Sequence, residues 1–485
     1  MGRRHRLRCN GAKASLNAPP GPPPLICLPR DGACRLLPSF RRKRGLNHGP
    51  APRTTKRAAD ANQFRHNHYV PEWYQKRFLL PGEHKYWYLD LKPEIVTNGK
   101  VRYTRRDLLN WGPDRCFAQD DLYTTKWGSI ENTELEQFFF GEIDSEGKGA
   151  VEYFADFAHP SANGEAFKTM LRYMTVQKLR TPKGLGSIAE LAKSESKNVN
   201  LLLLQRMQNI YSAIWTECIW QIADASDSET KLIISDHPVT VYNRDCFPMS
   251  EWCRGYSDPD IRLVATHTYF PLSIEKVLIL TNLAWVRDPY QSERALRPNP
   301  NFFRHAMFKF TDIQTDRKLA EEEVIQINYV TKRRALRYVA AAEKEWLYPE
   351  RQLGNRDHWR KLGDGYLFMP DPRHGHMGGE VIIGYKNGTS AAFGPYGHRP
   401  WQKGYKDPAR EKREWDSLER FKAEWAAMKG QDYTGVTFQF ASRGHPPMTR
   451  DSDEMHEHYL KLDAEIASRP GERSRRRRLR MEQPS

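Results

Sequence analysis

The stretch KLIISDHPVTVYN, residues 231–243, decides which fold this chain is expected to adopt. Its apolar, isoleucine-containing run predicts a strand, and Pro238 predicts a sharp corner because proline cannot continue a hydrogen-bonded ladder. A second extended piece follows the corner, and residues 266–273 and 275–282 predict two more strands. The chain therefore changes from helical to β-like patterning at this stretch.

Helical patterns dominate before that change. In residues 165–180, EAFKTMLRYMTVQKLR, apolar side chains and Lys178 recur at helical spacing, which predicts an amphipathic helix. Pro182 should end it, because the residue before a proline is pushed out of the α region. We expect a longer helical region over roughly 187–223 and a further helix over 317–343.

The first part of the main domain is expected to be extended. HNHYVPEWYQKRF at 66–78 predicts an arm that turns into a helix, and residues 85–91 and 100–104 predict short strands. Helices grouped in the middle of a domain with strands on either side favour a mixed α+β fold. A doubly wound fold would instead alternate strands and helices regularly.

The net charge of +16 is concentrated at the two ends of the chain. Residues 1–60 carry 14 Lys/Arg and nine prolines against two acidic residues, and residues 469–485 carry 7 Lys/Arg against two. Such composition buries too little apolar surface to offset chain entropy, so we expect disordered tails. These tails are the parts expected to attract nucleic acid or another polyanion. An organelle-type presequence and an over-long start are alternatives for the first tail.

Four parts follow from this patterning: a basic tail at 1–60, a main domain at 61–348, a small hairpin-helix appendage at 349–445 and a polar to polybasic tail at 446–485. Asn387-Gly388 between two β-like runs predicts the hairpin of the appendage. A helix should open at Asp407-Pro408, with several apolar side chains turned inward. These are Trp415, Leu418, Phe421, Trp425 and Met428.

Several protein classes are disfavoured by the sequence. The seven cysteines are dispersed without a C-x-x-C, which argues against a disulfide framework and for a reducing compartment. The longest aliphatic run, LLLL at 201–204, is too short to span a membrane. No phosphate-binding or dinucleotide-binding motif is present, and no motif implies a particular cofactor. A soluble, cytoplasmic protein is expected.

Two stretches raise the question of a metal site. His66 and His68 face the same way on a strand, and Asp236, His237 and His267 are the candidates for a third and fourth ligand. H-x-H alone is a weak signal, and we favour one buried and one solvated histidine. HGHMGG at 374–379 is better explained as an exposed glycine-rich loop. We therefore predict no metal site.

Asp236 is the strongest candidate for chemistry in the 231–243 stretch. A carboxylate at the end of an apolar strand, held by a proline corner, can project into a cleft as a base, a ligand or a hydrogen-bond acceptor. The simpler interpretation is a local turn in which the carboxylate caps nearby backbone amides.

Several ordered motifs together resemble the bacterial domain-of-unknown-function family DUF4238. They are His68-Tyr-Val-Pro with its following aromatics, Arg180-Thr-Pro, the corner Ser235–Val239, Pro271–Ser273 and Asn328 in a late helix. The resemblance covers roughly residues 66–345. The chain departs from the family pattern at Gln75 and at His237. The family carries no assigned activity, so the resemblance supplies positions rather than a mechanism.

The resemblance implies that His68, Asp236 and Asn328 meet in one place, because they are polar and come from three distant segments. One hypothesis is a hydrolytic enzyme, with a nuclease included, in which His68 is the base and Asp236 orients it. The alternative is a non-enzymatic interaction module with a structural polar network and basic tails that bind acidic partners. Between the two basic ends of the chain, residues 61–468 carry 55 Lys/Arg against 56 Asp/Glu and are close to neutral. This neutrality and the lack of an acidic metal cluster disfavour a two-metal nuclease.

Overall fold

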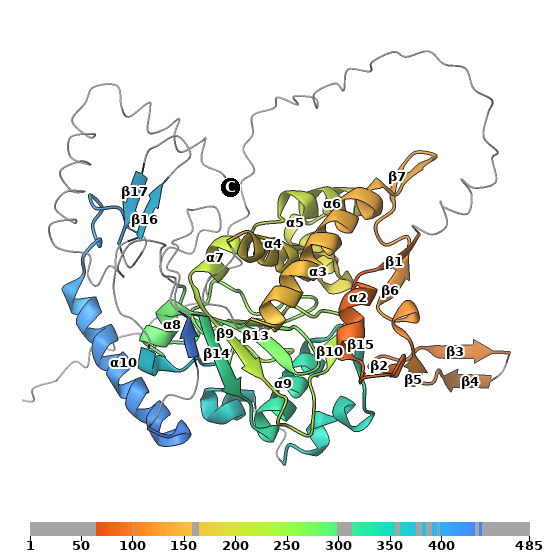
Figure 1. The fold of residues 1–485 in the computed structure, drawn as a ribbon. Coiled ribbons are helices and arrows are strands. Elements are labelled where there is room, and N and C mark those ends of the chain that lie inside the picture. The colour runs from red at the N-terminus through yellow and green to blue at the C-terminus, as the bar shows by residue number, and fades with distance from the viewer. Residues whose placement is uncertain are drawn as a thin grey trace, which may run out of the picture. The chain divides into compact units, whose positions relative to one another are not determined.

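The elements of the main domain and of part of the appendage are visible in a computed structural model (Figure 1). It describes residues 65–99, 101–157, 164–297, 313–354, 359–374, 381–384, 390–394, 396, 398–431 and 436–438. All of them belong to one structural unit, residues 54–485. The two predicted tails, the Asn387-Gly388 turn and residues 375–379 of the glycine-rich loop lie outside the described residues.

A six-stranded mixed sheet forms the centre of this unit, in the spatial order β11-β12-β13-β9-β14-β18. The strands are β11 (Thr240–Tyr242), β12 (His267–Pro271), β13 (Lys276–Asn282), β9 (Cys218–Asp224), β14 (Ile313–Lys318) and β18 (Val436–Phe438). Neighbours are antiparallel except β9 and β14, which run parallel. Strands that the sequence predicts on both sides of Pro238 and at 266–282 are therefore confirmed.

Nine α-helices are assigned within the described residues. They are α2 (Glu72–Gln75), α3 (Gly141–Ala155), α4 (Gly164–Arg180), α5 (Pro182–Ala192), α6 (Lys197–Arg206), α7 (Ser212–Thr216), α8 (Leu283–Arg287), α9 (Glu321–Arg334) and α10 (Pro408–Lys429). A π-helix, Leu135–Phe140, runs directly into α3. The predicted amphipathic helix at 165–180 is thus confirmed as α4, and α5 begins immediately after the break at Thr181.

Helices cover both faces of the central sheet, with α3 and α4 on one side and α9 on the other (Figure 1). Successive side chains of β13 explain why: Leu278 and Leu280 join the core that contains α3 and α4 residues, while Val277 and Ile279 join the core of α9. Strand side chains alternate between faces, so a strand that is apolar throughout must be buried on both. The result is a helix–sheet–helix arrangement.

A second sheet of four antiparallel strands brings distant parts of the chain together, in the order β10-β15-β2-β5. Its strands are β10 (Ile234–Ser235), β15 (Tyr338–Ala341), β2 (Tyr86–Asp90) and β5 (Leu108–Trp111). Four two-stranded hairpins or bridges complete the strands: β1 (His66–His68) with β6 (Ala118–Asp120), β3 (Ile95–Asn98) with β4 (Val101–Thr104), β7 (Thr125–Trp127) with β8 (Ile130–Asn132), and β16 (Val381–Gly384) with β17 (Ser390–Phe393). The α+β class is confirmed.

The expectation of helix through to residue 223 is wrong. Helices α5, α6 and α7 occupy 182–216, but Cys218–Asp224 is strand β9, paired with β13 along its whole length. Every residue of β9 is buried. A continuous apolar run looks the same in a buried strand and a buried helix, and the isoleucine and tryptophan content of this one suits a strand.

Two smaller expectations also fail. The helix predicted over 317–343 ends at Arg334, because Ala335 adopts an extended conformation. Residues 338–341, which were predicted to be helical, form strand β15. In α10, Leu418, Phe421 and Trp425 are buried as predicted, but Trp415 and Met428 are exposed by 52% and 40%. The inward stripe of α10 is therefore narrower than the sequence suggests.

Close approach of α3 to α4 depends on Gly147. A Cβ added at this position would lie 2.2 Å from Cδ2 of Tyr173, a fully buried ring on α4. The same helix carries Gly149, where an added Cβ meets nothing within 4 Å. The two glycines are thus a natural pair for testing packing against helix propensity.

We expect Gly147→Ala to lower the free energy of unfolding by roughly 1–3 kcal/mol, because the methyl group forces the two helices apart. Gly149→Ala should raise it by up to about 1 kcal/mol, because alanine is the better helix former and the site has room. Urea unfolding followed by tryptophan fluorescence measures both. Equal effects of the two substitutions would contradict the packing shown for Gly147.

Candidate functional site

The N-terminal corner places His68 at its outer side. Strand β1 alternates exposed, buried and half-buried residues, and its inward residue is Asn67, which accepts a hydrogen bond from the Tyr123 amide. His68 Nε2 lies 3.2 Å from the carbonyl oxygen of Asp114. The His66 and His68 rings are 5.1 Å apart, as expected for residues two apart on a strand. Burial lowers the pKa of His68.

Asp236 is committed to the main chain of a distant segment. Its Oδ1 accepts from the amide of Leu336 at 2.9 Å, and its Oδ2 accepts from the amides of Arg337 and Tyr338 at 2.6 and 2.9 Å. The residue is 3% exposed. Burial raises its pKa, and the three amides oppose that shift. The carboxylate thus fastens the corner after β10 to the segment between α9 and β15.

Asn328 also binds the backbone of the stretch that contains β10. Its Nδ2 donates to the carbonyl of Lys231 at 2.8 Å, and its Oδ1 accepts from the amide of Ile233 at 3.1 Å. The side chain is completely buried on α9. Asn328 therefore holds the approach to β10 against α9. Among the hydrogen bonds of the described residues, none joins His68 to Asp236 or Asn328, so their joint catalytic role stays a prediction.

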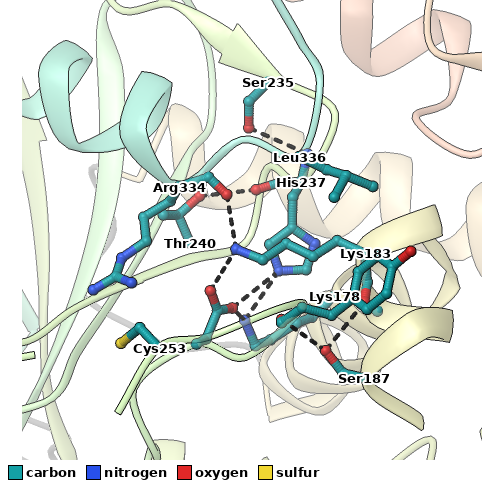
Figure 2. Close-up of polar contacts among 12 residues, drawn as sticks. Lys178, Lys183, Ser187, Ser235, His237, Thr240, Cys253, Arg334 and Leu336 are labelled. Atoms are coloured by element: carbon teal, nitrogen blue, oxygen red, sulfur yellow. Dashed lines mark hydrogen bonds and ion pairs between the residues drawn. The ribbon is translucent and has the colours of Figure 1, made fainter. Parts of the chain in front are cut away.

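The residue after Asp236 points into a different environment, because successive side chains of an extended segment face opposite ways. There His237 contacts Lys178 from the end of α4 (Figure 2). Asp258 contacts His237 as well, and it also pairs with Lys183 from the start of α5. Lys178 Nζ lies 2.7 Å from Asp258 Oδ2, and Lys183 Nζ lies 2.5 Å from Asp258 Oδ1. We call these four residues the Lys–His–Asp cluster. Their side chains are 2–13% exposed.

Hydrogen bonding indicates the tautomer of His237. The Lys178 ammonium has three protons and three acceptors within reach: Asp258 Oδ2, His237 Nε2 at 3.1 Å and the carbonyl of Val239 at 3.4 Å. Nε2 is then an acceptor, and Nδ1 carries the proton that it donates to Thr181 Oγ1 at 2.8 Å. This assignment satisfies every polar atom of the ring, so His237 is neutral.

Charges within the cluster shift its pKa values apart. Burial, reinforced by Lys178, lowers the pKa of His237 to about 3. Burial also lowers the pKa of Lys178, although Asp258 opposes it. For Asp258 burial favours the neutral acid, but the two lysines outweigh it and hold its pKa well below the usual range. The cluster thus joins two lysines to one carboxylate by ion pairs, beside an imidazole whose pKa lies far below its usual value.

Thr181 Oγ1 lies 2.8 Å from Nδ1 of His237 and Asp258 Oδ2 lies 3.3 Å from its Nε2, an order of residues that resembles a nucleophile–base–acid triad. In the tautomer assigned above Nε2 carries no proton, so the ring donates no hydrogen bond to Asp258. Thr181 does not suit the nucleophile's position, however. It is fully buried, and its hydroxyl oxygen already accepts from the amide of Gly184 as the N-cap of α5. A buried capping hydroxyl cannot reach a substrate. Thr181 is therefore a group that holds the imidazole.

Sequence reasoning missed Asp258 and Lys183 and undervalued Lys178. One signal was visible: Lys178 recurs with the apolar face of the predicted helix at 165–180. A lysine in a core-facing position needs a buried partner, because an unpaired buried charge is costly. The identity of that partner was not visible, since Asp258 is 80 residues away along the chain.

Other candidate sites in the described part of the chain offer less chemistry. A surface hollow of about 340 Å³ lies between the β7–β8 hairpin, the π-helix and α6, and the described residues that line it include Glu134 but no histidine, lysine or arginine. No group of three or more His, Cys, Asp or Glu in the described ranges could hold a metal ion. None of the helices described here is long and apolar enough to cross a bilayer.

The fold and the cluster together define an α+β protein with one buried Lys–His–Asp site at the junction of α4, α5 and β10. The chain belongs to DUF4238, a family described as proteins of unknown function, whose model matches residues 66–345. The predicted resemblance is thereby confirmed over the same residues. Neither the curated proteins nor the solved structures contain a match to this chain.

Asp236→Ala tests the structural work of that carboxylate. The substitution leaves three backbone amides without their acceptor, so we expect the free energy of unfolding to fall by roughly 3 kcal/mol or more. Asp120→Ala is the matched control, because Asp120 is an exposed aspartate whose carboxylate pairs with His66 at 2.7 Å. That control should stay within about 0.5 kcal/mol of the parent. Equal stability of the two variants in urea unfolding would contradict the role of Asp236.

Acid sensitivity follows from the buried histidines. Burial lowers the pKa of His267, as of His237, to about 3. The unfolded chain takes up a proton below about pH 6.5 while the folded chain does not, so stability is lost as the pH falls from 6.5 toward 3. Between pH 7 and pH 5, each of these two histidines should lower the free energy of unfolding by about 2 kcal/mol.

We therefore expect the free energy of unfolding of His267→Gln to fall by about 2 kcal/mol less than that of the parent between these two pH values. Urea unfolding at each pH measures both. A His267→Gln variant with the parent's pH dependence would show that this imidazole is protonated in the folded chain.

Proposed function

We propose that this chain is a hydrolytic enzyme and that its site is the Lys–His–Asp cluster. One observation carries the proposal: four ionisable side chains from three distant segments meet in direct contact, almost completely buried. Active sites are where burial and neighbouring charges move the pKa values of acids and bases apart. Here burial lowers the pKa of both His237 and Lys178.

His237 is the proposed base. Thr181 holds Nδ1, which leaves the lone pair of Nε2 to accept a proton, as in histidine-dependent hydrolases. In the structure Lys178 occupies that lone pair. Besides burial, the Lys178 charge lowers the pKa of the imidazole, so moving this ammonium group away from the ring raises that pKa toward the working range and frees the lone pair of Nε2. A bound substrate that draws Lys178 toward itself would supply both changes.

Lys178 and Lys183 are proposed to stabilise the negative charge that develops on oxygen in the transition state. Water attacks the carbonyl carbon or phosphorus of the substrate, and its proton passes to His237 Nε2. The bond to the leaving oxygen then breaks, and that oxygen takes the proton back from the imidazolium. Buried ammonium groups stabilise such charge strongly, because little solvent screens them.

The proposed roles of Asp236 and Asn328 are positional. Their contacts to the segments on either side of β10 fix the backbone from which His237 projects. In this proposal His68 takes no part in the chemistry, because its ring is bound to the carbonyl of Asp114 at the outer side of β1.

Hydrolysis of a panel of chromogenic substrates tests the proposal. The full chain is assayed with p-nitrophenyl acetate, p-nitrophenyl phosphate and bis(p-nitrophenyl) phosphate, and with single-stranded nucleic acid. For any substrate turned over, His237→Gln should lower kcat/KM by about 10²- to 10⁴-fold, because the base is lost. His66→Gln should change it less than about twofold, since exposed substitutions away from a site have small effects.

Circular dichroism at the assay temperature confirms that both variants are folded. Turnover that survives His237→Gln undiminished would exclude His237 as the base and would remove the basis of the proposed mechanism.

A further inference from the structure

Asp258 is the outermost member of the cluster. Its side chain is 13% exposed, against 2% for His237 and 8–9% for the two lysines. It comes from residues 243–266, a segment between β11 and β12 that contains no helix or strand. Connections of this length without regular structure are uncommon in compact domains and are often functional.

The two ends of this segment are tied together. Asn243 Nδ2 donates to Thr266 Oγ1 at 3.1 Å, and Trp359 Nε1 donates to the carbonyl of Asn243 at 3.0 Å. Near Asp258 the segment is held by Ser187 Oγ, which donates to the carbonyl of Tyr256 at 3.0 Å. Cys246, Cys253, Leu263 and Val264 are buried in the hydrophobic cores, so most of the segment is anchored. The part that can move without unpacking a core is residues 254–258, which are exposed or half-buried.

The two lysines do not depend on that segment for their positions. Lys183 Nζ also donates to the carbonyl of Arg334 at 2.7 Å, and Lys178 also contacts His237 and the carbonyl of Val239. Helices α4 and α5 carry both side chains. The side chains of Lys178 and Lys183 thus form a cradle that the two helices hold in place. Asp258 is an anion that a loop places in this cradle.

Charge requires that the cradle always holds an anion. Without Asp258, two buried ammonium groups would lie together, and Arg334 adds a further positive charge near Lys178. Asp236 lies close enough to Lys183 to feel its charge, but both of its oxygens are engaged by backbone amides. Breaking a buried ion pair by removing one partner is strongly unfavourable. Any state in which Asp258 leaves must bring in another anion.

We propose that the Lys178–Lys183 pair is a binding site for the oxoanion of a substrate, a carboxylate or phosphate group that replaces the Asp258 carboxylate when the exposed part of the segment, residues 254–258, lifts. This inference rests on the proposed function and names the class of substrate. Lysine ammonium groups act as point charges and accept either oxoanion. The replaced carboxylate shows the geometry: one oxygen faces each lysine, and His237 Nε2 lies 3.3 Å from one of them.

Asp258→Asn provides the test, because it keeps the shape of the side chain and removes the competing charge. The full chain and this variant are titrated with inorganic phosphate and with acetate by isothermal calorimetry. We expect Asp258→Asn to bind at least one of the two anions ten or more times more tightly than the parent. Tighter binding of phosphate assigns a phosphoryl substrate, and tighter binding of acetate assigns a carboxylate.

Two double variants locate the bound anion. Adding Lys183→Met to Asp258→Asn should abolish the gain in affinity, because one ammonium group is lost. Adding Lys168→Met should leave the gain intact, since Lys168 is an exposed lysine on α4 paired with Glu165. A folded Asp258→Asn variant that binds neither anion would overturn the proposal, as would a gain that survives Lys183→Met.

If Asp258→Asn does not fold, hydrogen exchange of the parent decides the matter. Millimolar phosphate or acetate should speed amide exchange within residues 243–266, and unchanged exchange with both anions would overturn the proposal. These readouts involve no turnover. Anion binding without any effect of His237→Gln on hydrolysis would reject the proposed function and keep the binding site, whereas the reverse result would reject the binding site alone.

Discussion

The Asp236 carboxylate, which accepts hydrogen bonds from three consecutive backbone amides, is the interaction on which the architecture of the site depends. It ties the end of β10 to the chain that leaves α9, so the four-stranded sheet and α9 are fixed relative to one another at this point. A single charged acceptor shared by three amides is stronger than three neutral bonds and leaves no donor unsatisfied. The backbone of His237 is fixed as a consequence.

The Lys–His–Asp cluster is a costly feature for a core. Moving ammonium and carboxylate groups out of water is unfavourable, and their mutual attraction repays this only when the geometry is good. An apolar replacement of similar volume would often be at least as stable. Retaining four ionisable side chains in mutual contact therefore suggests a purpose other than stability. Proton transfer and anion binding are two purposes that need these groups.

Local patterns in the sequence predicted much of the secondary structure, because helix α4 and the strands around Pro238 depend on apolar periodicity and on proline. Strand β9 was mistaken for helix because its burial on both faces removes the alternation that distinguishes strands. Asp236 was expected to act in catalysis, which stays a prediction, or to cap amides of its own turn. The amides that it caps lie in a segment 100 residues away, and no local pattern specifies which distant amides a carboxylate will meet.

The site could not be predicted for the same reason, because its contacts join residues that no local pattern brings together. The contact between Lys178 and Lys183 through Asp258 exists only because the helix breaks between them. In a continuous α-helix, residues five apart project about 140° from one another, so their side chains cannot both contact one carboxylate. Thr181 adopts an extended conformation, with φ −65° and ψ 158°, and thereby separates α4 from α5.

Thr181 combines two tasks in that break. Its hydroxyl oxygen accepts hydrogen bonds from the amide of Gly184, which caps α5, and from His237 Nδ1, so one atom sets both the joint between the helices and the tautomer of the imidazole. Pro182 follows at the first position of α5, where its missing amide costs no hydrogen bond. The Arg-Thr-Pro motif was predicted to end a helix. Its larger consequence is that two lysines on either side of it converge on one anion, with the imidazole held beside them.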